Sequence, residues 1–227
     1  LLAQQASAAV GTINPLAAII NSLLFGLGAL ALALPMGVLV SVVATHEGSG
    51  SRFAEALLTA PLAVSGIVLG LGMLRTLVFG TTVFGHRLTV TGPIAIVAAH
   101  AIAAYPFVTR NVTPALSGID DRLVDAARAL GADRPTVLVD IELPLIAPAL
   151  IAGAAFAFAI SIGEFDSTVL LAEGVDSATM PVALERYTAN RSLGPNLGPA
   201  TAMGTVLLAV TTGSFMLIDR TGRRWER

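Results

Sequence analysis

The residues best placed for chemistry lie in one polar stretch between long apolar runs. We call residues 125–144 the polar segment; they read Asp-Ala-Ala-Arg-Ala-Leu-Gly-Ala-Asp-Arg-Pro-Thr-Val-Leu-Val-Asp-Ile-Glu-Leu-Pro. Six of the chain's 13 basic and 15 acidic residues lie in it. Charged side chains are costly inside a bilayer, so on an otherwise apolar chain this segment must face water. Its side chains are therefore available to a partner in the aqueous phase.

Signals for two short helices lie in and just before the polar segment. Ser117 or Asp120 can begin the first helix, Gly131 can end it, and Asp133 can begin the second helix. An apolar stripe at helical spacing is formed by Leu123, Ala127 and Leu130. Pro135 suits the first turn of the second helix, and Leu143-Pro144 is expected to stop that helix. A short structure that is apolar on one side and charged on the other suits a groove on a partner.

Three further ionisable residues fall inside apolar runs. Glu164 and Asp166 lie near the outer end of a predicted span, and His100 lies in the middle of another. An ionisable group at such depth usually faces a cavity or a partner. One interpretation is that these residues line a solute path or its outer gate. The other is that Glu164 and Asp166 form a helix-terminal turn and that His100 bonds a neighbouring helix.

The composition indicates an all-α membrane protein. Of the 227 residues 55% are hydrophobic and 12% are charged, whereas roughly a quarter are charged in a soluble domain; the mean hydropathy is +0.80. The net charge of −2 offers no nucleic acid footprint, and no nucleic acid partner is expected. The chain has no cysteine, which excludes disulfides, thiolate metal sites and cysteine nucleophiles, and we expect no metal.

Five segments are long and apolar enough to span a bilayer. They cover about 15–44, 57–79, 90–109, 148–172 and 199–218. We therefore predict one transmembrane domain over 15–218, with a cytoplasmic loop over 110–147 that contains the polar segment. Residues 1–14 form an extracytoplasmic segment and residues 219–227 a basic cytoplasmic tail.

Arginine placement predicts the orientation of the spans. The loops on the side of the polar segment hold nine arginines, and the loops on the other side hold three. An excess of basic residues marks the cytoplasmic side. The N-terminus is then on the outer side of the cell membrane and the C-terminus is in the cytoplasm. There the tail can contact anionic lipid. An outside N-terminus suggests a preceding span that this sequence does not contain.

The polar segment resembles the EAA loop of ABC-importer permeases. The matching landmarks are Asp125, Ala126, Ala127, Gly131, Ile141, Leu143 and Pro144. The family usually has Glu at the first of these positions, so Asp125 is a conservative departure. The flanking Gly163-Glu164-Phe165 resembles a turn in permeases for oxyanions, iron and thiamine, where the family has Gly in place of Asp166. The resemblance covers about residues 15–218.

This resemblance implies a type I ABC importer (MetI-like) fold and a transport role rather than an enzymatic one. In such importers the loop inserts into a cleft on an ATPase subunit, and closure of an ATPase pair switches the permease between inward-facing and outward-facing states. The expected partners are that ATPase pair, an extracytoplasmic solute-binding protein, a second permease half or homodimer mate, and membrane lipid. No cofactor is expected in this chain, which has no phosphate loop; ATP-Mg belongs to the ATPase.

Two other functions and several solutes stay open at this point. An ion-coupled secondary transporter could use Glu164, Asp166 and His100. An intramembrane hydrolase could use Ser161, although no second histidine lies within a span. For an importer, the turn at residues 163–165 points to ferric iron, thiamine, sulfate or molybdate. We favour iron or thiamine, because a permease fused from two halves would explain the odd number of spans.

Overall fold

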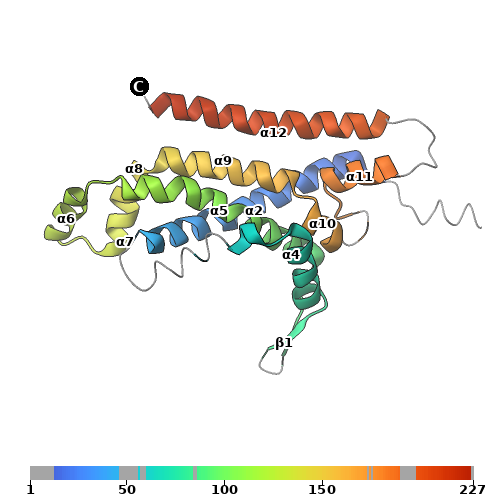
Figure 1. Cartoon of the computed structure of the whole chain (residues 1–227), viewed down its shortest axis with the longest axis horizontal. Coiled ribbons are helices and arrows are strands. Elements are labelled where there is room, and N and C mark those ends of the chain that lie inside the picture. Colours follow the sequence, from blue (N-terminus) through green and yellow to red (C-terminus); the bar gives the residue numbers. More distant parts are fainter. Residues whose placement is uncertain are drawn as a thin grey trace, which may run out of the picture.

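Four long helices run side by side in the computed structural model of the chain (Figure 1). They are α2 (Pro15–Ala44), α5 (Gly92–Ser117), α9 (Ala147–Gly163) and α12 (Gly198–Trp225). The structure describes residues 13–45, 56, 60–83, 86–172, 174, 176–189 and 198–225. Nearly all of these residues are helical, which confirms the predicted all-α class.

Helix α2 shows how this sequence forms a bundle. Asn14 caps its start, because the Asn14 side chain accepts a hydrogen bond of 3.0 Å from the N–H of Leu16. The buried residues of α2 recur every three or four positions and are all small: Ala18, Ser22, Gly26, Ala29, Ala33, Gly37 and Ser41. Small residues on one face let helices approach closely in lipid. The leucines of the opposite face are exposed, as a surface against lipid requires.

The centre of the bundle is the contact of α2 and α9 with Val108 of α5. A Cβ added at Gly37 of α2 would lie 2.6 Å from the Cβ of Val108. A Cβ added at Gly153 of α9 would lie 3.0 Å from the Cα of Val108. Val108 is completely buried. The three helices therefore meet at a distance that leaves no room for a Cβ at Gly37 and little room for one at Gly153.

Shorter elements cover the end of the bundle away from the polar segment. They are α4 (Gly66–Met73), the π-helical η1 (Leu74–Val78), α10 (Asp166–Leu171), α11 (Met180–Ala189) and an antiparallel hairpin of β1 (Thr81–Val83) and β2 (His86–Leu88). Helix α10 packs against α4 and α5. The axis of α4 runs across the long helices, and the hairpin projects beyond it (Figure 1).

The spans differ in part from those that hydropathy predicts. Among the described residues, three helices are long and apolar enough to cross a membrane: Pro15–Ala44, Gly92–Ser117 and Gly198–Met216. The first has the predicted bounds. The second continues beyond the predicted 90–109, so that residues 110–117 of the predicted loop are helical. The third continues as α12 to Trp225, into the predicted tail.

The other two predicted spans are shorter helices. The one predicted over 57–79 is an apolar helix over Gly66–Val78, and residues 57–59 of its predicted start lie outside the described residues. The one predicted over 148–172 ends as α9 at Gly163, because Glu164 has extended backbone (ψ 119°) and the chain restarts as α10.

Because of the close approach at Val108, we predict that one added methyl group destabilises the protein at Gly37 but not at a glycine with free space around it. Gly37→Ala should lower the free energy of unfolding by about 1–3 kcal/mol, because the new Cβ overlaps Val108. Gly213→Ala is the matched control in α12, since a Cβ there meets nothing within 4 Å. Thermal unfolding in detergent compares the two variants, and equal melting temperatures would contradict the packing described.

Candidate functional site

The first helix of the site, α6 (Asp121–Ala129), has the predicted beginning and end. At its start the Asp120 carboxylate accepts a hydrogen bond of 2.9 Å from the N–H of Arg122. At its end Gly131 has a φ of 90°, a conformation that favours glycine. The N–H of Gly131 donates to the carbonyl of Arg128, and the N–H of Ala132 donates to that of Ala127. This pair of bonds is the Schellman ending, which stops α6 sharply.

The second helix, α7 (Arg134–Val137), also begins where the sequence predicts. The Asp133 carboxylate accepts a hydrogen bond of 3.0 Å from the N–H of Thr136, and Pro135 lies in the first turn. Hydrogen bonds from Thr136 hold the pKa of Asp133 below its ordinary value. The cap therefore stays charged near neutral pH, and its contribution is lost only as the pH falls through that lowered pKa.

The prediction that Leu143-Pro144 stops this helix is wrong. The chain continues through the π-helical η2 (Leu138–Glu142) and α8 (Leu143–Leu145), and it bends by 78° before α9. In η2 the N–H of Leu143 bonds to the carbonyl of Leu138, five residues back. Proline lacks an N–H and its ring needs space in the preceding turn. A wide π turn directly before Pro144 provides that space, so the bend falls at the buried Ile146 instead.

One ion pair joins the start of α7 to the end of η2. Nη1 of Arg134 lies 2.9 Å from Oε1 of Glu142. The Glu142 side chain is only 8% exposed, whereas that of Arg134 is 36% exposed. A buried carboxylate without its partner is strongly unfavourable, so this pair fixes α7 against the end of η2. The pair of Arg128 and Asp125, at 3.8 Å, is exposed on both sides and contributes little.

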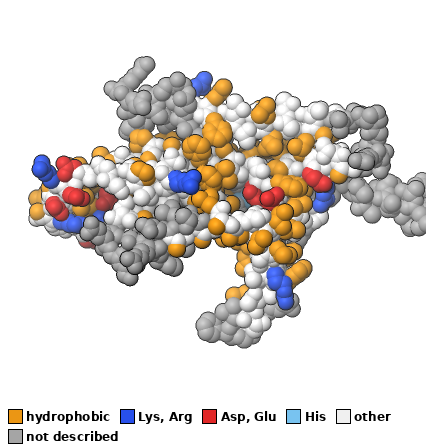
Figure 2. All heavy atoms as spheres, viewed as in Figure 1, with side chains coloured by type: hydrophobic (Ala, Val, Ile, Leu, Met, Phe, Trp, Pro, Cys, Tyr) orange, Lys and Arg blue, Asp and Glu red, His pale blue; other side chains and the backbone are white. Residues whose placement is uncertain are grey.

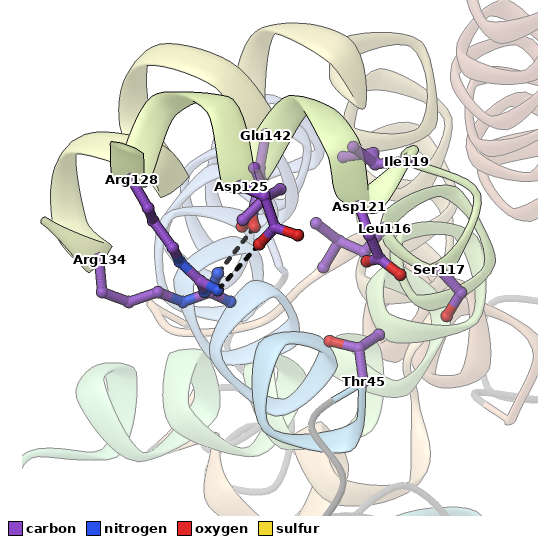
Figure 3. A pocket seen from close by; sticks show the side chains of 10 residues that line it. Thr45, Leu116, Ser117, Ile119, Asp121, Asp125, Arg128, Arg134 and Glu142 are labelled. Atoms are coloured by element: carbon purple, nitrogen blue, oxygen red, sulfur yellow. Dashed lines mark hydrogen bonds and ion pairs between the residues drawn. The ribbon is translucent and has the colours of Figure 1, made fainter. Parts of the chain in front are cut away.

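A polar cavity of about 530 Å³ separates α6 from the bundle. Its walls come from Thr45 after α2, from Ser117 at the end of α5, and from Asp121, Asp125 and Arg128 on α6. In Figure 3 the side chains of Arg128 and Arg134 extend across it to the carboxylates of Asp125 and Glu142. The inner face of α6 therefore borders a polar hollow and not the packed helices.

The opposite face of α6 carries apolar side chains that no described part of the chain covers. Leu123 is 51% exposed and Leu130 is 89% exposed. Charged and apolar side chains gather together at this end of the molecule, around α6 and α7 (Figure 2). Burying a leucine side chain against a partner removes apolar surface from water and is favourable. The face of Leu123 and Leu130 thus has the chemistry of a docking surface.

The predicted site residues lie on α6, at the turn after it, and on the stretch formed by η2 and α8. Asp125, Ala126 and Ala127 lie on α6, Gly131 lies at the turn, and Ile141, Leu143 and Pro144 lie on η2 and α8. Asp125, Ala126, Gly131 and Pro144 are exposed, and the other three are half-buried. The sequence reasoning did not single out Arg134 and Glu142. Their opposite charges eight positions apart could have suggested the pair, but a π turn was needed to bring them together.

The structure also describes the three ionisable residues predicted to lie within spans, which are Glu164, Asp166 and His100. Oε1 of Glu164 accepts hydrogen bonds from the N–H and the hydroxyl of Ser167, at 3.1 and 3.0 Å. Asp166 is exposed at the start of α10. His100 is buried, with Nδ1 2.8 Å from the Ser161 hydroxyl oxygen and Nε2 2.7 Å from that of Thr168. The contact of His100 with Ser161 has the spacing of a hydrolase pair, but both residues are at most 2% exposed, which closes them to a substrate.

The chain is similar to known transport proteins. The sequence profile of a family described as binding-protein-dependent transport system inner membrane component matches residues 29–227. The molybdenum transport system permease protein ModB of Escherichia coli K12 is 31% identical over 176 residues, which cover 74% of this chain and 76% of ModB. A probable sulfate transport system permease protein, cysT, of Chlorokybus atmophyticus is 30% identical over 188 residues, covering 77% of this chain and 63% of that protein.

Solved structures share the fold at lower sequence identity. The inward-facing MetNI methionine ABC transporter matches with a TM-score of 0.66 and 20% identity, over 92% of this chain and 93% of the matched chain. A bacterial ABC transporter involved in import of the acidic polysaccharide alginate matches with a TM-score of 0.71 and 18% identity, over 92% and 79%.

Because of the ion pair with Glu142, we predict that replacing Arg134 destabilises the protein more than replacing Arg128. Arg134→Ala should destabilise η2 by about 1–3 kcal/mol, because it leaves the buried Glu142 carboxylate without its partner. Arg128→Ala is the matched control, and its effect should stay under about 1 kcal/mol, since its pair is exposed. Hydrogen exchange of the amides of residues 138–142 measures both effects. If the two variants exchange alike, the ion pair does not hold this turn.

Proposed function

The chain belongs to the family of binding-protein-dependent transport system inner membrane components, and from this membership we propose that the polar segment is the surface on which its ATPase docks. A member of this family is a membrane-spanning permease subunit of an ABC importer. The chain has the helical fold of MetI-like importer permeases, as its sequence predicts. It is a transport subunit and not an enzyme, and the ATPase activity belongs to a partner subunit.

The observation that carries this proposal is the exposed stripe on α6. Leu123 and Leu130 project into water from a helix that is capped at both ends and stands off the bundle across the polar cavity. An amphipathic helix with such anchors fits a hydrophobic groove. In an ABC importer the partner that provides such a groove is the ATPase subunit. That subunit holds ATP-Mg, for which this chain has no binding motif.

The helices on either side of the polar segment would carry the motion of the ATPase into the membrane. α5 ends at Ser117, three residues before the Asp120 cap of α6, and α9 starts directly after the bend at Ile146. Closure of two ATPase subunits would move two such segments together and switch the permease between its two states. The second segment belongs to another permease copy or half. An external binding protein would deliver the solute at the opposite end.

The proposed orientation places the polar segment and the C-terminus in the cytoplasm and the N-terminus outside. The arginine distribution supports it. In Figure 1 the C-terminus lies at the same end of the bundle as α6 and α8, and α11 lies at the other end. The Tyr187 hydroxyl of α11 donates a hydrogen bond of 2.6 Å to the carbonyl of Ile13, which holds the start of α2 at that other end.

For the solute we favour an oxyanion such as molybdate or sulfate over ferric iron or thiamine. The support is that similar permeases are named for molybdenum and sulfate transport. The acidic character of Glu164 is no argument for a cationic solute, because its carboxylate is engaged by Ser167. The ion-coupled secondary transporter loses its basis for the same reason and because both ring nitrogens of His100 are engaged.

The docking proposal predicts that one leucine holds the ATPase. Leu130→Ala should reduce the ATPase that copurifies with the permease about tenfold or more, because an anchor side chain at the centre of an interface dominates its stability. Leu208→Ala is the matched control, since Leu208 is 67% exposed but lies on α12. Retention of the ATPase by Leu130→Ala at the level of the control would refute the docking surface.

The solute proposal predicts which compound enters ATP-loaded proteoliposomes that contain the complete transporter with its binding protein. Radiolabelled molybdate or sulfate should accumulate inside them. Uptake of thiamine or ferric iron with no uptake of either oxyanion would overturn the assignment and leave the docking surface unaffected.

A further inference from the structure

Three helices are fastened together at one buried histidine. His100 of α5 bonds Ser161 near the end of α9 and Thr168 in α10. We propose that His100 is a positioning residue that passes the movement of α5 and α9 to α10 and to the turn that carries Glu164. This inference rests on the proposed function, because it takes the polar segment as the place where that movement begins.

The hydrogen bonds at His100 form one directed chain. The Thr168 hydroxyl donates to the carbonyl of Glu164 at 3.2 Å, so its single proton is used there. In that arrangement its oxygen accepts from Nε2–H of His100, and a neutral imidazole accepts at its other nitrogen. Nδ1 therefore accepts from the Ser161 hydroxyl. Each of the three side chains is at most 2% exposed, so removal of any one leaves a buried polar group without its partner.

Two of the three helices that meet at His100, α5 and α9, flank the polar segment. His100 lies 17 residues before Ser117, which is about 25 Å along α5 at the rise of an α-helix. The glycine contact at Val108 and Gly153 holds α5 against α9 between those two points. The two helices therefore form one arm, with the polar segment at one end and His100 at the other.

At the far end of this arm, α10 is enclosed on its other side by α4. A Cβ added at Gly66 would lie 2.8 Å from the Cβ of Asp166, and one added at Gly70 would lie 2.8 Å from the Cα of Ser167. The Glu164 carboxylate holds the first turn of α10 through Ser167. Because α10 packs so closely against α4, a displacement of the arm would carry Glu164, α10 and α4 with it.

Two pairs of variants test this role in the complete transporter in proteoliposomes. Ser161→Ala removes the hydroxyl at Nδ1; its control is Ser22→Ala, which removes an equally buried hydroxyl that accepts from the N–H of Met180, away from the arm. Thr168→Val removes the second hydroxyl with little change of shape; its control is Thr168→Ser, which keeps a hydroxyl. The readouts are solute transported per ATP hydrolysed and stimulation of the ATPase by the solute-loaded binding protein.

Ser161→Ala and Thr168→Val should lower both readouts roughly threefold to tenfold. Basal ATPase activity and the amount of attached ATPase should not change, and both controls should behave as the wild type. If Ser161→Ala and Thr168→Val match their controls, or if Ser22→Ala lowers the readouts equally, His100 only packs the helices. Leu130→Ala in the same assay separates this failure from a failure of the proposed function, because only Leu130→Ala tests attachment of the ATPase.

Discussion

The structure depends on the close approach of three helices around Val108. Lipid tails are as apolar as the side chains they would replace, so helices in a membrane are held by contact at short range and by hydrogen bonds. Gly37 and Gly153 allow that contact from both sides of α5. Because α5 and α9 are joined there, the chain between them emerges from two fixed points. The polar segment is positioned by the bundle even though a polar cavity lies between the bundle and α6.

The polar segment combines stiffness with separation from the rest of the molecule. Caps at Asp120 and Asp133, the turn at Gly131 and the ion pair of Arg134 with Glu142 fix its internal shape. The polar cavity keeps the inner face of α6 apart from α2 and α5. A force applied to the exposed leucines would therefore be transmitted through the ends of the segment to α5 and α9. Those helices reach the buried hydrogen bonds of His100 at the opposite end.

The sequence predicts what local chemistry determines. Asp120, Gly131 and Asp133 begin or end helices where their side chains or backbone preferences require it. Features that depend on tertiary contacts were not predictable in the same way. The π turn before Pro144 and the bend at Ile146 arise from packing within the predicted loop, and α9 ends early at Gly163 inside a run that hydropathy treats as one span. Likewise, the sequence shows His100 in a span but not that Ser161 and Thr168 are its partners.

The most direct test of the central claim uses the natural absence of cysteine from this chain. Ala129→Cys introduces a single thiol at the exposed end of α6 beside Leu130 and keeps that leucine in place, so the thiol can be cross-linked in membranes of intact cells and of inside-out vesicles. The account predicts a cross-link to the ATPase subunit, and labelling by a membrane-impermeant thiol reagent only in inside-out vesicles. Labelling from outside intact cells, or a cross-link to the external binding protein, would contradict it.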